Sequence, residues 1–72
     1  MYFESFASKL QKARYDTGFT QRDIEKELNI KQSRLASYES GRTQPDIETL
    51  GKLIDFYGID ANWLIGTKGK NK

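Results

Sequence analysis

Gln32, Ser33 and Ser37 have side chains whose types and spacing could do chemistry, because a helix would place them on one exposed face. A Gln amide carries a donor and an acceptor side by side, and these match the N6 and N7 atoms of adenine in the major groove of DNA. A Ser hydroxyl can bond to either type of base edge. The pattern therefore predicts a helix that contacts bases, and the alternative is a merely solvated helix start.

Other kinds of chemistry find little support in the composition. The sequence contains no His and no Cys, which removes the commonest metal ligand, the commonest general base at neutral pH and any thiolate. Asp23 and Glu27 form a close carboxylate pair at i, i+4, but no cleft signal accompanies them, so a solvated helix face is the better interpretation. We expect no enzyme, no cofactor and no bound metal.

The candidate face needs two short amphipathic helices around a tight turn, and residues 20–39 spell that arrangement. Thr20 can cap the first of these helices, Asp23 can complete a capping box, and Phe19 can pack on Ile24 as a hydrophobic staple. Asn29 falls where this helix should stop, and Asn tolerates the left-handed backbone that a short turn needs.

The second helix is predicted to begin at Lys31 or Gln32. Leu35 and Tyr38, at i, i+3, turn toward the core and leave the polar face outside.

Three further helices are predicted as scaffold. The first runs from about Glu4 to Asp16 and ends at Gly18, with Phe3, Phe6, Leu10 and Ala13 on its buried stripe. The fourth begins after Pro45 and ends at Gly58, with Gly51 toward solvent and a buried face made of Ile47, Leu50, Leu53, Ile54 and Tyr57. The last is short, capped by Asp60, closed by Gly66, and carries Trp63, Leu64 and Ile65.

Length and charge indicate one small all-α domain. The chain has 72 residues and a net charge of +2, and its basic residues gather in 31–44 while 45–65 is acidic. We expect the domain to span 1–66, followed by a flexible basic tail at 67–72. No apolar run suits a signal peptide or a membrane span, so a cytoplasmic protein without a membrane partner is expected.

The residues from about Phe6 to Gly66 resemble the Cro and phage-repressor type of helix-turn-helix domain, also called lambda-repressor-like or XRE-type. The resemblance rests on these positions: Leu10, Arg14, Gly18 to Gln21, Ile24, Leu28, Ser33 to Leu35, Ser37 to Gly41, Pro45 to Leu50, and Ile59 to Leu64. It implies a compact five-helix domain that regulates transcription of phage, mobile-element or host genes. Such a protein would repress by binding a palindromic operator as a homodimer, with its third helix in the major groove of double-stranded DNA. The alternative is a protein-binding module of the same fold, such as an antitoxin.

The resemblance also implies roles for individual residues. Base contacts fall to Gln32, Ser33 and Ser37, and phosphate contacts to Gln21, Lys31, Arg34, Ser40, Arg42 and Thr43. Gln21 can also bond Gln32, Arg34 can alternatively pair with Glu25, and Arg14 and Glu39 form an internal ion pair. A dense apolar group at the opposite end either fills the core or makes a dimer interface, and both uses are expected: Phe56, Tyr57, Ile59, Trp63 and Ile65.

Three positions depart from the pattern of the family. Glu25 stands where the family usually has Ala, Asn29 replaces the usual turn Gly, and Lys31 replaces the Ser that normally caps the reading helix. Loss of such a cap costs about 1 kcal/mol. We expect Glu25 to pair with Arg34 or Lys31, or to turn outward into water.

Overall fold

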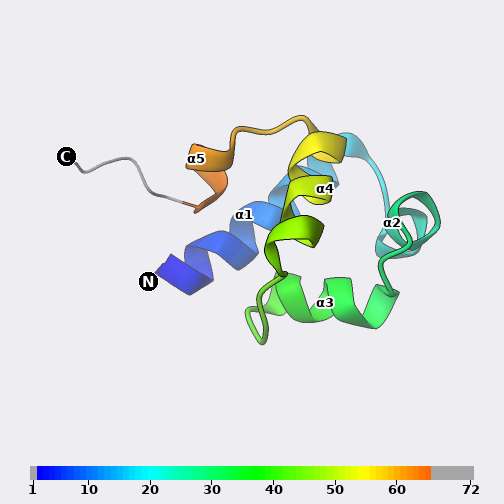
Figure 1. Cartoon of the computed structure of the whole chain (residues 1–72), viewed down its shortest axis with the longest axis horizontal. Coiled ribbons are helices and arrows are strands. Elements are labelled where there is room, and N and C mark those ends of the chain that lie inside the picture. Colours follow the sequence, from blue (N-terminus) through cyan, green and yellow to red (C-terminus); the bar gives the residue numbers. More distant parts are fainter. Residues whose placement is uncertain (1, 66–72) are drawn as a thin grey trace.

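The computed structural model describes residues 2–65, with side chains described from Phe6 onward. That part of the chain forms five helices and no strand (Figure 1): α1 (Tyr2–Thr17), α2 (Gln21–Leu28), α3 (Gln32–Ser40), α4 (Ile47–Tyr57) and α5 (Ala61–Ile65). The predicted all-helical, five-helix architecture is confirmed. The side chain of Phe3, the closing Gly66 and the basic tail at 67–72 lie outside the described residues.

The helix ends follow the local signals in the sequence closely. Gly18 takes a positive φ of 82° directly after α1, as predicted, although α1 begins at Tyr2 and not near Glu4. Asp60 caps α5, because its Oδ1 accepts the backbone N–H of Asn62 at 3.2 Å. Within residues 2–65, no helix combines the length and the apolar character needed to cross a lipid bilayer.

Each of the five helices supplies one fully buried aliphatic side chain to a shared core. The largest fully buried side chains among the described residues are Leu10, Ile24, Leu35, Leu53 and Leu64. Around them α1 packs against α3, α4 and α5, and α2 packs against α3. Figure 1 shows α3 along one edge of the molecule, with α2 at its start and the first turn of α4 above its end. The core thus presents the outer face of α3 to solvent.

Ile47 departs from the prediction for the fourth helix. The periodicity placed it on the buried stripe, but its side chain is 86% exposed, so that prediction is wrong. Ile47 is the first residue of α4, and Asp46 and Thr49 beside it line an open groove shared with α3. The rest of the stripe is buried or half-buried, and Gly51 is exposed as predicted.

Candidate nucleic-acid interface

The turn that joins α2 to α3 is fixed by contacts at both ends of α2. At the start, the Thr20 Oγ1 accepts the Asp23 N–H at 3.1 Å, and the Asp23 carboxylate accepts the Thr20 N–H at 2.9 Å. This is the predicted capping box. At the end, Asn29 takes φ 58° and ψ 40°, the left-handed conformation predicted for it, and donates its N–H to the Glu25 carbonyl at 2.8 Å. The direction in which α3 leaves α2 is therefore set locally.

The first turn of α3 has a cap that comes from α2. Lys31 occupies the N-cap position but makes no side-chain cap, since an ammonium group has no acceptor. Instead, Oε1 of Glu25 accepts the backbone N–H of Gln32 at 3.1 Å. Glu25 is exposed, in line with the outward alternative, but its partner is a backbone N–H and not the cation expected from the sequence.

A hydrogen-bonded chain runs from the interior of the domain to Gln32. Arg14 and Glu39 are each only 7% exposed, and their side chains pair through Nε–Oε2 at 2.8 Å and Nη2–Oε1 at 3.0 Å. The third donor of Arg14, Nη1, bonds the Phe19 carbonyl at 3.0 Å. Hydrogen bonding to Glu39 raises the pKa of Arg14, and burial opposes it more weakly. The pair therefore ties α1 to α3 beneath the exposed face.

The charge of Glu39 fixes the orientation of two amides further along this chain. A carboxylate can only accept, so Gln21 turns its Nε2 toward Oε1 of Glu39, at 3.0 Å. The Oε1 of Gln21 then faces outward and accepts the Nε2 of Gln32 at 2.7 Å. Since this bond uses one N–H of the Gln32 amide, a second N–H and the amide oxygen can meet a ligand. That donor–acceptor pair is the one that adenine's major-groove edge requires.

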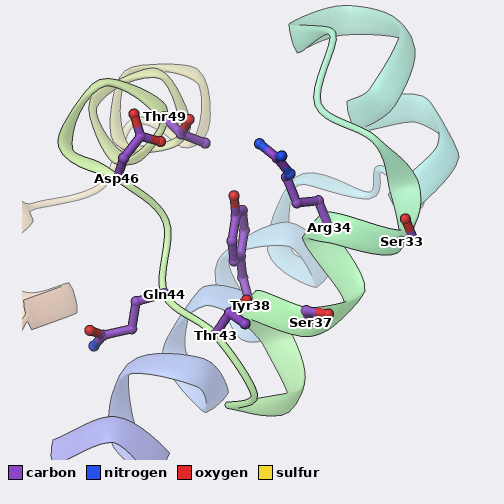
Figure 2. Close-up of a pocket in the computed structure, with 8 residues that line it drawn as sticks. All are labelled: Ser33, Arg34, Ser37, Tyr38, Thr43, Gln44, Asp46 and Thr49. Atoms are coloured by element: carbon purple, nitrogen blue, oxygen red, sulfur yellow. The ribbon is translucent and has the colours of Figure 1, made fainter.

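A groove beside this face separates the end of α3 from the start of α4. It is lined by Ser33, Arg34, Ser37 and Tyr38 of α3, Thr43 and Gln44 of the loop, and Asp46 and Thr49 at the start of α4. Figure 2 shows Arg34 extending across it toward Asp46 and Thr49. Polar contact with Thr49, and more weakly the charge of Arg34, hold the pKa of Asp46 below its ordinary value. Arg34 therefore faces Asp46. The alternative prediction, a pairing of Arg34 with Glu25, is wrong, because the Glu25 carboxylate bonds the Gln32 N–H instead.

The remaining polar candidates surround the outer face of α3. Lys31, Ser33, Ser40, Arg42 and Thr43 are exposed, while Gln32 and Ser37 are partly buried. Ser40 donates its hydroxyl to the Ser37 carbonyl at 3.1 Å. After Gly41, whose φ is 83°, the N–H of Arg42 bonds the same carbonyl at 3.0 Å. The loop thus bends back along α3 and keeps Arg42 and Thr43 close to the polar face.

The five apolar residues predicted to fill the core or form a dimer interface divide between core and surface. Tyr57 is 7% exposed and belongs to the core, which is the first of the two uses expected for it. Phe56 is half-buried against Phe19, with ring centroids 5.1 Å apart, and Ile59 and Ile65 are also half-buried.

Trp63 is 37% exposed. Lys9 lies 5.5 Å from its ring centroid and donates to its carbonyl at 2.8 Å.

The core role of Tyr57 leaves one polar atom unsatisfied. Its hydroxyl is buried and has no hydrogen-bond partner among the described residues. Burial, and secondarily the negative charge of Glu39, raise the pKa of this phenol. The hydroxyl remains a neutral group that contributes no bond in this structure.

Sequence reasoning missed two parts of this site. The bond from Glu25 to the Gln32 backbone had a usable signal, because Gln21 and Glu25 are at i, i+4 on α2 and Lys31 cannot cap. The placement of Gln44, Asp46 and Thr49 beside α3 had none, because it depends on the path of a loop between two helices.

The fixed turn between α2 and α3, the solvent-facing side of α3 and the hydrogen-bonded chain from Arg14 to Gln32 together define a helix-turn-helix domain. Comparison with known proteins agrees. A family model described as "Helix-turn-helix domain" matches residues 7–70, and the chain belongs to that family. The chain is 36% identical over 62 residues to the HTH-type transcriptional regulator ImmR of Bacillus subtilis, covering 86% of this chain and 49% of the relative.

Two further relatives extend the comparison. YonR, an SPbeta prophage-derived HTH-type transcriptional regulator of Bacillus subtilis, is 32% identical over 60 residues, covering 83% of this chain and 56% of YonR. A putative multi-protein-binding factor 1 of Yarrowia lipolytica is 34% identical over 71 residues, covering 92% of this chain and 47% of the relative. The chain spans about half the length of these curated relatives.

Proposed function

We propose that this protein is a sequence-specific DNA-binding regulator of transcription, a repressor that reads the major groove with α3. The observation that carries the proposal is the bond between Gln21 and Gln32, anchored on the buried Arg14–Glu39 pair. A solvated helix start has no need for a buried charge behind it. The names of the bacterial relatives, both HTH-type transcriptional regulators, point in the same direction.

Base recognition in this proposal falls mainly to Gln32. Its free N–H donates to adenine N7 and its oxygen accepts from N6 while the other N–H stays bonded to Gln21. Ser33 and Ser37 lie on the same face of α3 and contact neighbouring base edges. Ser37 is small enough to let the helix enter the groove deeply.

Phosphate contacts position the domain on the duplex without reading sequence. We assign them to residues that flank the reading face: Gln21, Lys31, Arg34, Ser40, Arg42 and Thr43. The cations among them lie at the start of α3, on its flank and in the loop that follows, so they would meet the phosphate backbone on either side of the groove.

We further propose that the protein acts as a homodimer through the apolar surface around Trp63. Exposed aromatic surface is costly for a monomer, and Trp63 is 37% exposed, while Phe56, Ile59 and Ile65 are each only half-buried. A two-fold dimer would place two copies of α3 about 34 Å apart, one turn of DNA, and so select a palindromic operator.

A second candidate function is protein binding by the same fold. It draws support from the exposed Ile47 and from a relative whose name is multi-protein-binding factor. Protein binding does not require the hydrogen-bonded chain that positions Gln32, and for this reason DNA reading is preferred.

Selection of bound duplexes from a random pool tests the proposal, with Gln32→Ala carried through the same selection. We expect wild type to enrich an inverted repeat with half-sites about 10 base pairs apart, and the variant to lose its preference at one position per half-site. Enrichment of no sequence by wild type would overturn DNA reading and favour the protein-binding candidate.

A further inference from the structure

Gln32 is held at two points by side chains that lie one turn apart on α2. Gln21 accepts its side-chain Nε2 at 2.7 Å, and Glu25 accepts its backbone N–H at 3.1 Å. We propose that Glu25 is a positioning residue that sets the base discrimination of Gln32 by holding the start of α3 in place. This inference rests on the proposed DNA-binding function and adds a specificity-determining residue to it.

The first turn of α3 needs an acceptor that its own N-cap residue lacks. Backbone N–H groups at a helix start have no partner within the helix, and Lys31 adds a cation where the helix dipole is already positive. The Glu25 carboxylate supplies the missing acceptor for an N–H, and its negative charge offsets the positive charge at the helix start. The cap lost by having Lys31 at this position is therefore replaced from another helix.

Fraying of this turn would act directly on the base reader. Gln32 is the first residue of α3, so loss of the Glu25 bond would release the backbone from which its amide projects. The next turn is held independently, because Leu35 is fully buried and Tyr38 is buried beside it. We therefore expect the loss to appear as weaker discrimination at the base pair that Gln32 reads, with the remainder of α3 still in place.

A purely electrostatic role for Glu25 makes a different forecast. If this carboxylate only repelled phosphate, its removal would strengthen binding to all sequences alike. Glu25→Gln removes the charge and keeps an amide oxygen that can accept the N–H, whereas Glu25→Ala removes both. Glu27→Ala is the matched control, because Glu27 is an exposed acid on the same helix, two residues further along.

The test measures dissociation constants for the preferred duplex and for one in which the base pair read by Gln32 is replaced. We expect Glu25→Ala to reduce the ratio of the two constants about fivefold, the effect of losing one helix cap. Glu25→Gln and Glu27→Ala should keep the wild-type ratio. In a Gln32→Ala background, Glu25→Ala should lower the ratio no further, because the side chain that it positions is gone.

A second measurement works without DNA and follows the backbone N–H of Gln32 by NMR. In wild type Glu25 accepts this N–H, so its exchange with solvent should be faster in Glu25→Ala than in wild type and close to the wild-type rate in Glu25→Gln. A Glu25→Ala protein that keeps the full ratio, or a Gln32 backbone N–H that exchanges equally fast in wild type and Glu25→Ala, would overturn the inference while leaving DNA reading intact. Equal ratios for wild type and Gln32→Ala would instead overturn the proposed function, and this inference with it.

Discussion

Replacing Gln32 and Gln21 by Ala, singly and together, most directly tests the hydrogen-bonded chain that links Glu39, Gln21 and Gln32. A bidentate contact from Gln32 to adenine is worth about 1 to 3 kcal/mol of discrimination. Gln21 accepts a hydrogen bond of 2.7 Å from Gln32 and itself donates to Glu39 at 3.0 Å, so the loss of Gln21 frees the long side chain of Gln32 to rotate. A hydrogen bond and the ordering that it supplies are worth about 1 kcal/mol.

The two losses should therefore be less than additive. Once Gln32 is gone, Gln21 no longer positions a base reader, and the double variant should lose, relative to Gln32→Ala, only the phosphate contact proposed for Gln21. We expect a coupling energy of about 1 kcal/mol, measured by fluorescence anisotropy on the selected operator and on a duplex with the adenine replaced. Thermal unfolding of all four proteins serves as the control for folding, and the midpoint of Gln32→Ala should stay close to that of wild type.

Two results would refute this reasoning. Additive losses would mean that Gln21 and Gln32 act separately, whatever their distance in the free protein. A Gln32→Ala protein that folds normally and keeps its full sequence preference would remove Gln32 from the role of base reader.

Four further predictions concern charge, packing and assembly. Arg42→Ala should weaken binding to all sequences alike and lower the magnitude of the salt slope by about one unit, whereas loss of preference at a single base pair would make Arg42 a base reader. Tyr57→Phe removes the buried hydroxyl without a partner and should raise the free energy of unfolding by about 1 kcal/mol in urea titrations. Tyr38→Phe is the control and should show no such gain, because Tyr38 lines the groove and its hydroxyl is not among the buried groups without a partner. Bonding to Thr20 lowers the pKa of Asp23, so the stability that it contributes is present above the ordinary carboxyl pKa of about 3.9 and is lost as pH falls below it. The stability gap between wild type and Asp23→Asn should accordingly close under acid. Trp63→Glu should shift sedimentation toward a monomer, and a wild type that is strictly monomeric at micromolar concentration, with an asymmetric selected site, would contradict the dimer.

Local chemistry explains how much of this fold could be predicted from the sequence. The capping box of Thr20 and Asp23 and the left-handed Asn29 depend on atoms within a few residues, and each was found where the sequence placed it. The prediction that Ile47 is buried failed because burial depends on which element lies opposite the side chain. The periodicity of α4 gives the face on which Ile47 lies, but not whether another helix covers that position.

The site shows the same division between local and tertiary information. A side chain as long as that of Glu25 can reach several partners, and the choice between a cation and the Gln32 N–H was decided by where the turn delivers α3. Tyr57 was placed in the core by the packing of α4 as a whole. Distances within the amide chain likewise required the relative placement of three helices, although the residue types could be read from the sequence.

The core that takes one fully buried aliphatic side chain from every helix leaves no part of the domain able to stand alone. Five residues are too few for α5 to persist by itself in water, so it is helical because Leu64 fills a space between its neighbours. Withdrawing Leu64 would open a cavity beside α1, against which α3 also packs. Unfolding should therefore be a single all-or-none event over these five helices, and amide exchange in α5 should slow to the rate set by global opening.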